Sequence, residues 1–398
     1  MKKIIASLAA ALCLAASLPG SSRAEGFALT DWSARASALA GGIVARGGDA
    51  SAVSYNPAAI AGLDGTRLML GADIATIRTT IVTPLGRQKD GVKYYPIPHF
   101  YATHKYNDKW SFGVGSYARF GLGVKYNPGW LGRYNLNKVY LQVMSIAPVA
   151  AYSVSDRLSL AIGPEISWAS MTMDRSIPVM PGVDRSLRLS GQGYSLGLVA
   201  GLHYRPLDNV SVGLSYHSRM RFAVSGKTKG VFSSDLSGVL KLPDHVNLGV
   251  CWAPTEKLSF EADVAYFAWS VYKNLDMNFK DLHMVNHSPK HWNDTWSFSV
   301  SVEYRPIREL ALRAGYRIEN SPVNRNYADY MAPTNGSQRF SLGIGYEYKN
   351  WTFDFSYVYS PNRSLCYDTS WKNVAGVYPG KTHDTYARSM VFSIGYKF

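Results

Sequence analysis

From residue 66 to the C-terminus, large apolar residues alternate with small or polar ones. In 340–348, five large hydrophobic side chains stand at every second position, and serine, glycine and glutamate fill the positions between them. Residues 351–359 and 194–205 repeat the pattern. Because successive side chains of a β-strand point to opposite faces, the alternation predicts strands with one apolar face and one small or polar face.

The connections between these strands fall into two kinds. Short polar turns follow aromatic residues, as where Tyr106 precedes Asn107-Asp108-Lys109 and Tyr348 precedes Lys349-Asn350. Longer segments rich in Gly, Pro and Asn separate the other strand ends: 120–138, 174–189, 226–240, 274–291, 322–336 and 361–383. Aromatic rings at one depth, with short turns on one side and long loops on the other, are typical of outer-membrane barrels.

The strands group into seven up-and-down units, which predict an all-β, 14-stranded antiparallel transmembrane barrel over residues 66–398. The units are 66–106, 110–154, 158–205, 210–253, 258–305, 310–348 and 351–398. Closure is expected because hydrocarbon cannot satisfy the backbone groups of an open edge. The last strand ends in Phe398, with apolar residues on the same face at 390, 392, 394 and 396. This ending resembles the signal read by the barrel assembly machinery, and we expect a monomer.

The first 24 residues predict a signal peptide, with Lys2 and Lys3 before an apolar stretch and small residues around Arg23. Cleavage after Ala24 would remove those three cations and lower the formal charge from +14 by three, to +11. An exported basic protein favours anionic cargo and anionic outer-membrane lipid, including lipopolysaccharide, over nucleic acid as its partner. Of the three cysteines, Cys251 and Cys366 would remain, and we expect both to be free thiols.

Residues 25–65 lack the strand alternation and are rich in Ala, Gly and Leu. Two interpretations stand: a disordered periplasmic tail, or a plug (hatch) folded inside the barrel. Their low charge favours burial in the lumen.

Several short motifs stand out along the chain, and the most specific is Asn56-Pro57-Ala58. It resembles the hatch motif of the FadL/TodX family of outer-membrane transporters for long-chain fatty acids and hydrophobic compounds. The others are Glu25-Gly26-Phe27, Asp49-Ala50-Ser51, Phe120-Gly121-Leu122, 130–134, Leu242-Pro243-Asp244, 313–316 and Ser321-Pro322-Val323. The resemblance implies a 14-stranded barrel blocked by a hatch, and passive uptake through a lateral opening at a kinked third strand. The cargo implied is a long-chain fatty acid or similar amphiphile, with small aromatic hydrocarbons as the alternative.

One departure from the family lies at the expected kink. Where the family tends to place proline, this chain has Arg119, whose side chain strand parity points inward. Glycines can still bend that strand: Gly113, Gly115, Gly121 and Gly123. We therefore expect the lateral gap at these glycines and Arg119.

Strand parity also places many charged side chains in the lumen. Most should pair with one another, because buried charges need partners. Three arginines are candidates for holding a carboxylate headgroup: Arg313, Arg317 and Arg339. The resemblance adds Lys290, although parity counted back from Tyr304 faces it outward. Aromatic residues expected in the outer loops could capture cargo: Trp130, Tyr134, Trp269 and Tyr272.

The sequence gives little support for catalysis. The pairs His217-Ser218 and His287-Ser288 are adjacent, so on a strand their side chains face opposite ways. The histidines show no zinc-ligand spacing, and we expect no cofactor and no metal. A general porin or a structural surface barrel is the remaining alternative, which a plug would disfavour.

Overall fold

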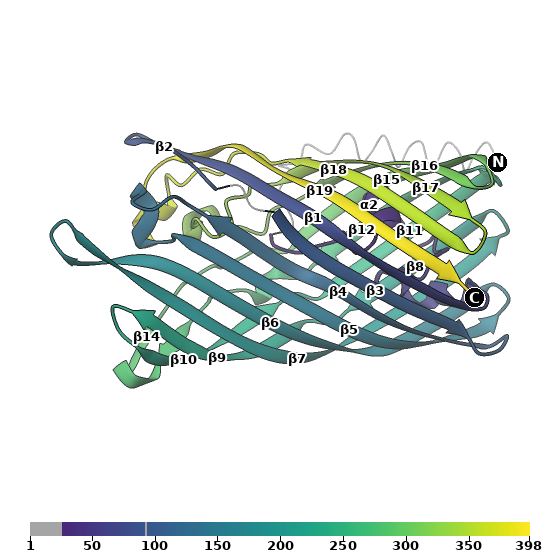
Figure 1. Cartoon of the computed structure of the whole chain (residues 1–398), viewed down its shortest axis with the longest axis horizontal. Helices are drawn as coiled ribbons and strands as arrows, with labels where there is room; N and C mark the ends of the chain where they lie inside the picture. Colours follow the sequence, from purple (N-terminus) through teal and green to yellow (C-terminus); the bar gives the residue numbers. More distant parts are fainter. Residues whose placement is uncertain (1–25, 92–93) are drawn as a thin grey trace.

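The computed structural model describes residues 26–91 and 94–398, so the expected signal peptide lies outside the described residues. Their strands form one closed antiparallel barrel (Figure 1), in which β1 pairs with both β19 and β3. Its fourteen wall strands are β1 (Thr66–Thr83), β3 (Tyr94–Lys105), β4 (Trp110–Lys125), β5 (Lys138–Ser155), β6 (Leu158–Met180), β7 (Val183–Leu207), β8 (Val210–His217) continued by β9 (Met220–Gly230), β10 (Ser234–Leu242) continued by β11 (His245–Thr255), β12 (Leu258–Phe267), β15 (Thr295–Ile307), β16 (Leu310–Glu319), β17 (Ser337–Tyr348), β18 (Trp351–Pro361) and β19 (Lys381–Lys397). The predicted strand number and the closure are confirmed.

Short elements fill the loops at the other end of the barrel from the tight turns. Three are strands: β2 (Gly86–Lys89), β13 (Met277–Phe279) and β14 (Met284–Asn286). Five are 3₁₀ helices: η2 (Leu131–Tyr134), η3 (Trp269–Val271), η4 (Lys280–Leu282), η5 (Arg325–Tyr327) and η6 (Ser370–Lys372). None of the helices in the described residues has the length and apolar character needed to cross a membrane.

Two neighbouring wall strands are broken at the same level. The seventh strand breaks at Ser218 and Arg219, and the eighth at Pro243 and Asp244. Asp244 holds the two breaks together, since its carboxylate accepts from the backbone N–H of Arg219 at 3.0 Å and from its Nε at 2.9 Å. Proline has no N–H for a ladder, so Pro243 ends the pairing of its strand.

The alternation of apolar and polar residues along each strand places the apolar side chains on the outside of the barrel and the small or polar ones in the lumen. Large outward side chains such as Leu196, 73% exposed, are left for the membrane. Aromatic residues at the tight-turn end are exposed in the same way: Tyr106, Trp110, Tyr204, Tyr304, Tyr348, Trp351 and Phe398. This is the apolar band and aromatic girdle that the sequence predicts.

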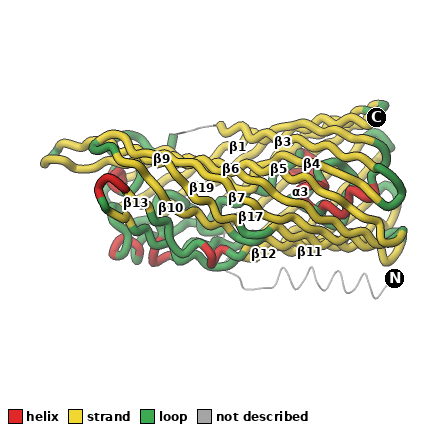
Figure 2. The backbone as a smooth tube through the Cα atoms, turned by 90° about the horizontal axis from the view of Figure 1, so that it is seen from below, coloured by secondary structure: helices red, strands yellow, loops and turns green. Residues whose placement is uncertain are grey.

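The hatch lies inside the lumen, where Figure 2 shows its short helices enclosed by strands. It contains α2 (Ala34–Ala38), α3 (Ala52–Tyr55) and η1 (Pro57–Gly62), and Ser33 caps α2 by accepting from the N–H of Ala36. All residues of α2 and α3 are buried. Of the two interpretations of this segment, the plug inside the barrel is therefore confirmed and the disordered periplasmic tail is not.

The Asn-Pro-Ala motif fixes the hatch to the wall. Asn56 Oδ1 accepts from the N–H of Ala58 at 3.2 Å, which caps η1, and Pro57 occupies its first position. Asn56 Nδ2 donates to the carbonyl of Val44 at 2.7 Å and to that of Leu202, on β7, at 3.0 Å. The approach is so close that a Cβ on wall residue Gly201 would lie 2.3 Å from Asn56 Oδ1.

Candidate functional site

The wall has a break in pairing between β3 and β4. Their ladder runs from Lys105–Ser111 to Phe100–Ser116 and ends there. Beyond that point β3 stays paired with β1 as far as Tyr94, and β4 stays paired with β5 as far as Lys125. The parts of β3 and β4 nearer the long loops therefore have no ladder between them, and this unpaired stretch of the wall is here called the opening.

A bulge and two prolines account for the opening. The register of β4 against β5 shifts at Arg119, between Ala118 and Phe120, which bends β4 at this residue. On the facing strand, Pro96 and Pro98 have no N–H to donate, which restricts them to an edge. The Tyr95-Pro96-Ile97-Pro98 run was a sequence signal for an edge strand that the alternation analysis missed.

The four glycines expected at the kink divide into two pairs. Gly121 and Gly123 lie just beyond the bulge, in the part of β4 that has no partner on β3. Gly113 and Gly115 pair regularly with Thr103 and Tyr101, below the opening. There the missing side chains make room for the hatch, since a Cβ at Gly113 would lie 2.7 Å from Val53 Cγ2.

The first residues of the hatch cover the opening from inside. The N–H of Leu29 donates to the carbonyl of Arg119 at 2.9 Å, and the N–H of Gly121 donates to the carbonyl of Phe27 at 3.0 Å. Residues 27–29 thus form a short strand along the unpaired edge of β4. They satisfy backbone groups that lipid cannot.

Phe27 anchors this short strand in a cage of aromatic rings. Its ring centroid lies 4.8 Å from Trp269, 5.8 Å from Tyr272 and 5.2 Å from Trp292. Phe120 of β4 closes the cage at 6.3 Å. The contacts with Trp269, Tyr272 and Phe120 are edge-to-face, an arrangement that stabilises a buried ring beyond its area burial.

Residues 90 and 91 border the opening at its end nearer the long loops. The N–H of Gly91 donates to the carbonyl of Lys125 at 2.9 Å, and Asp90 forms an isolated bridge with Tyr126. Burial raises the pKa of the Asp90 carboxyl to about 6.

Two cavities lie beside this opening. The lumen cavity has about 180 Å³ and lies beside residues 26–31 of the hatch. The gap cavity has about 60 Å³ and lies between β3 and β4. They share five lining residues: Leu29, Ala75, Ile77, Gly121 and Leu122. The two cavities therefore adjoin each other along these five residues, four of which are apolar and one of which is glycine.

The comparisons with known proteins agree with this architecture. Residues 15–398 match the family model described as outer membrane protein transport protein (OMPP1/FadL/TodX). The chain belongs to this family. It is 24% identical to outer membrane protein P1 of Haemophilus influenzae, over 92% of each chain. In fold it is similar to a Pseudomonas aeruginosa FadL homologue (TM-score 0.86, 19% identity, 94% of this chain and 100% of the other) and to the Pseudomonas putida toluene transporter TodX (TM-score 0.76, 18% identity, 94% and 100%).

Members of the OMPP1/FadL/TodX family are outer-membrane transport proteins, so this chain is one too. The predicted location and the resemblance to this family are confirmed.

In this OMPP1/FadL/TodX protein, the four residues proposed for a carboxylate headgroup each have an acidic partner. Arg313 donates to Glu303 at 2.6 Å and to Asp354 at 2.5 Å. Arg317 lies 3.1 Å from Glu319. Arg339 pairs with Asp31, and Lys290 pairs with Asp329.

The orientation of the Lys290 side chain differs from the one expected from strand parity. It precedes β15, which begins at Thr295, so strand parity does not apply to it. Its side chain is only 3% exposed. The predicted outward orientation is wrong, because a loop folds the ammonium group onto Asp329.

The aromatic residues expected to capture cargo lie deeper than the sequence indicated. Trp269 and Tyr272 are buried in the cage around Phe27. Trp130 is buried too, stacked on Tyr126 with a centroid distance of 4.1 Å. Tyr134 is half-buried, and its hydroxyl donates to Asp184 at 3.0 Å.

Proposed function

We propose that this protein takes up uncharged hydrophobic molecules passively, from the lumen cavity sideways through the gap between β3 and β4. The observation that carries the proposal is that the two cavities share five lining residues at the unpaired stretch between β3 and β4. Residues 27–29 of the hatch cover the passage from inside, so they would move when cargo passes. A concentration gradient is sufficient to drive the step.

The hatch opposes an axial route to the periplasm. Arg35 binds Glu303 of β15 at 3.0 Å, and Arg46 lies 3.6 Å from Glu261 of β12. Removing one partner from a buried ion pair costs about 3–5 kcal/mol. Cargo moving straight down would have to separate several such pairs, whereas the lateral route displaces only a short strand.

The lining of the lumen cavity favours uncharged cargo. It includes three acidic residues, Asp31, Asp73 and Glu319, and the guanidinium of Arg339 is already paired with Asp31. Arg388 also borders the cavity, but its guanidinium lies over the rings of Tyr359 and Tyr386. Since Asp31 and Glu319 are already paired with Arg339 and Arg317, a carboxylate cargo would have to compete with these acids for their guanidinium groups.

The size of the cavity supports the same cargo class. A protein cavity of about 150 Å³ accepts benzene, and the lumen cavity has about 180 Å³. We infer a cargo of the size of a monoaromatic hydrocarbon. Long-chain fatty acids and similar amphiphiles are the competing class.

Ala75→Phe tests the route, because Ala75 borders both cavities. Ala72→Phe on the same strand is the matched control, since alternation points it to the lipid side with Leu70. We would measure uptake of radiolabelled toluene by intact cells with equal amounts of each barrel in the outer membrane. Ala75→Phe should abolish uptake and Ala72→Phe should leave it unchanged. Unchanged uptake with Ala75→Phe would refute the route.

The cargo class needs a separate comparison. Binding of oleate and of methyl oleate to the purified barrel distinguishes the two classes, because only the acid carries charge. An uncharged site predicts that the ester binds at least as well as the acid. Tighter binding of oleate would assign the protein to fatty acid uptake.

A further inference from the structure

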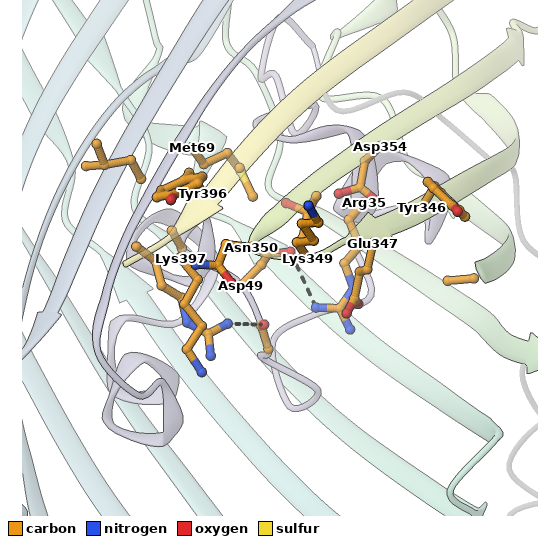
Figure 3. Close-up of a pocket in the computed structure, with 18 of the residues that line it drawn as sticks. Arg35, Asp49, Met69, Tyr346, Glu347, Lys349, Asn350, Asp354, Tyr396 and Lys397 are labelled. Atoms are coloured by element: carbon orange, nitrogen blue, oxygen red, sulfur yellow. Dashed lines mark hydrogen bonds and ion pairs between the residues drawn. The ribbon is translucent and has the colours of Figure 1, made fainter. Parts of the chain in front are cut away.

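A third cavity opens at the tight-turn end of the barrel (Figure 3). It has about 420 Å³ and lies between hatch residues 48–50 and the ends of β1, β17, β18 and β19. Figure 3 shows Arg35 and Asp49 of the hatch and Glu347 and Asp354 of the wall among the residues that line the cavity. The cavity shares no lining residue with the lumen cavity. It is therefore separate from the proposed transport route.

The lining of this cavity is strongly basic. Seven basic side chains border it: Arg35, Arg67, Arg305, Arg308, Arg313, Lys349 and Lys397. Only three acidic side chains do so: Asp49, Glu347 and Asp354. A concave site with one sign of excess charge concentrates its potential on the solvent inside.

The acids neutralise the inner part of the cavity. Arg35 pairs with Asp49 and Glu303, and Arg313 pairs with Glu303 and Asp354. Arg305 Nη1 donates to Glu347 at 2.7 Å. The inner wall is therefore a closed ionic network that joins the hatch to β15, β16 and β18.

The outer part of the cavity keeps its positive charge. Within the described residues, Arg67, Arg308, Lys349 and Lys397 have no carboxylate at ion-pair distance. Arg67 donates only to carbonyl oxygens, of Asp64 at 3.3 Å and of Gly48 at 3.5 Å. The bond to Gly48 is long, so this guanidinium retains donors for a stronger acceptor.

We propose that this cavity binds an anionic phosphate group between the hatch and the barrel wall. Arginine suits this role because its planar fork donates two parallel hydrogen bonds to a phosphate. Arg67 of β1 and Lys397 of β19, which are cross-strand partners, would hold the anion from one side, and Arg308, in the turn between β15 and β16, would hold it from the other. Because Arg67 already donates to the carbonyl of Gly48, the bound anion would lie beside this loop of the hatch.

The phosphate could belong to a lipid headgroup or be free in the periplasm. Tyr346, Tyr396 and Phe398 line the same cavity, and girdle aromatics mark the level of lipid headgroups. Both sources offer the same chemistry to the cavity. The experiment therefore needs one arm for each.

The first arm measures binding of inorganic phosphate and pyrophosphate to the full-length barrel in uncharged detergent by isothermal titration calorimetry. We expect saturable binding that weakens as salt is added. The double variant Arg308→Gln/Lys397→Gln should lose it. The control Lys109→Gln/Arg157→Gln removes the same charge from two other tight turns and should retain it. Heat-modifiable gel mobility would verify that every variant is folded.

The second arm reconstitutes the same proteins in nanodiscs of phosphatidylcholine with or without phosphatidylglycerol, and quantifies lipid that stays bound after extraction. Retention of phosphatidylglycerol by the wild type and the control, but not by the double variant, would identify a lipid source. Saturable binding in the first arm alone would identify a soluble phosphate. Absence of specific binding in both arms, or equal loss in the control variant, would overturn the proposal.

Discussion

The guanidinium of Arg119 donates to the carboxylate of Glu165 at 2.9 Å, and both side chains are almost completely buried. Arg119 is the bulge residue of β4, and Glu165 lies on β6. The same guanidinium donates to the carbonyls of Ser218 at 3.1 Å and of Pro243 at 3.5 Å, where two wall strands break. Since the carbonyl of Arg119 accepts from Leu29, one residue joins the bulge, the breaks and the hatch.

The first prediction concerns this ion pair. Arg119→Met should reduce the free energy of unfolding by about 3–5 kcal/mol, because it leaves the carboxylate of Glu165 buried without its cationic partner. The double variant Arg119→Met/Glu165→Met should recover most of that loss. Urea unfolding in phospholipid vesicles, followed by tryptophan fluorescence, measures both. Equal loss in the single and double variants would show that the pair itself contributes little.

The second prediction concerns the hatch. Deletion of residues 26–60 should leave a folded, heat-resistant barrel, because the wall strands pair with one another. The lumen would then be open, so single-channel conductance in planar bilayers should rise well above that of the intact protein. A deletion variant with the conductance of the intact protein would contradict the plug.

The third prediction concerns Phe27. Phe27→Ala removes the ring from its cage, at a loss of about 0.5–1.5 kcal/mol for each aromatic contact. Residues 27–29 should then separate from β4 more often. Amide hydrogen exchange of Leu29 and Gly121 should become faster. The control Phe112→Ala removes a lipid-facing ring from β4 and should leave the exchange rates of these two amides unchanged.

The fourth prediction concerns the pH dependence of the contact at Asp90, at the loop end of the opening. The folded pKa of Asp90, about 6, is above its usual value of 3.8, so the folded contact favours the protonated carboxyl. The stabilisation is therefore complete below about pH 4 and is lost as the pH rises through 6. Exchange of the Gly91 amide, corrected for intrinsic rates, should be faster at pH 7 than at pH 5. Asp90→Asn should abolish this difference, and a difference that persists would assign the effect to another group.

The number of strands and their facing could be predicted from the sequence alone. In 340–348 the residue type at each position indicates whether its side chain faces the lipid or the lumen, because strand geometry is local and repeats every two residues. The hatch was distinguished by its lack of this alternation, and the motif at Asn56 by its resemblance to a family. The edge character of β3 was also present in the sequence, at Pro96 and Pro98.

The partners across the lumen were decided only by the tertiary structure. Arg313 meets Glu303 on the neighbouring strand, but Arg339 meets Asp31 of the hatch, more than 300 residues away in sequence. Such pairs depend on the stagger of the strands and on how the hatch packs, which no local pattern encodes. The same holds for the opening, since a ladder ends where two distant strands diverge. Periodicity therefore determined the wall, and long-range packing determined the passage through it.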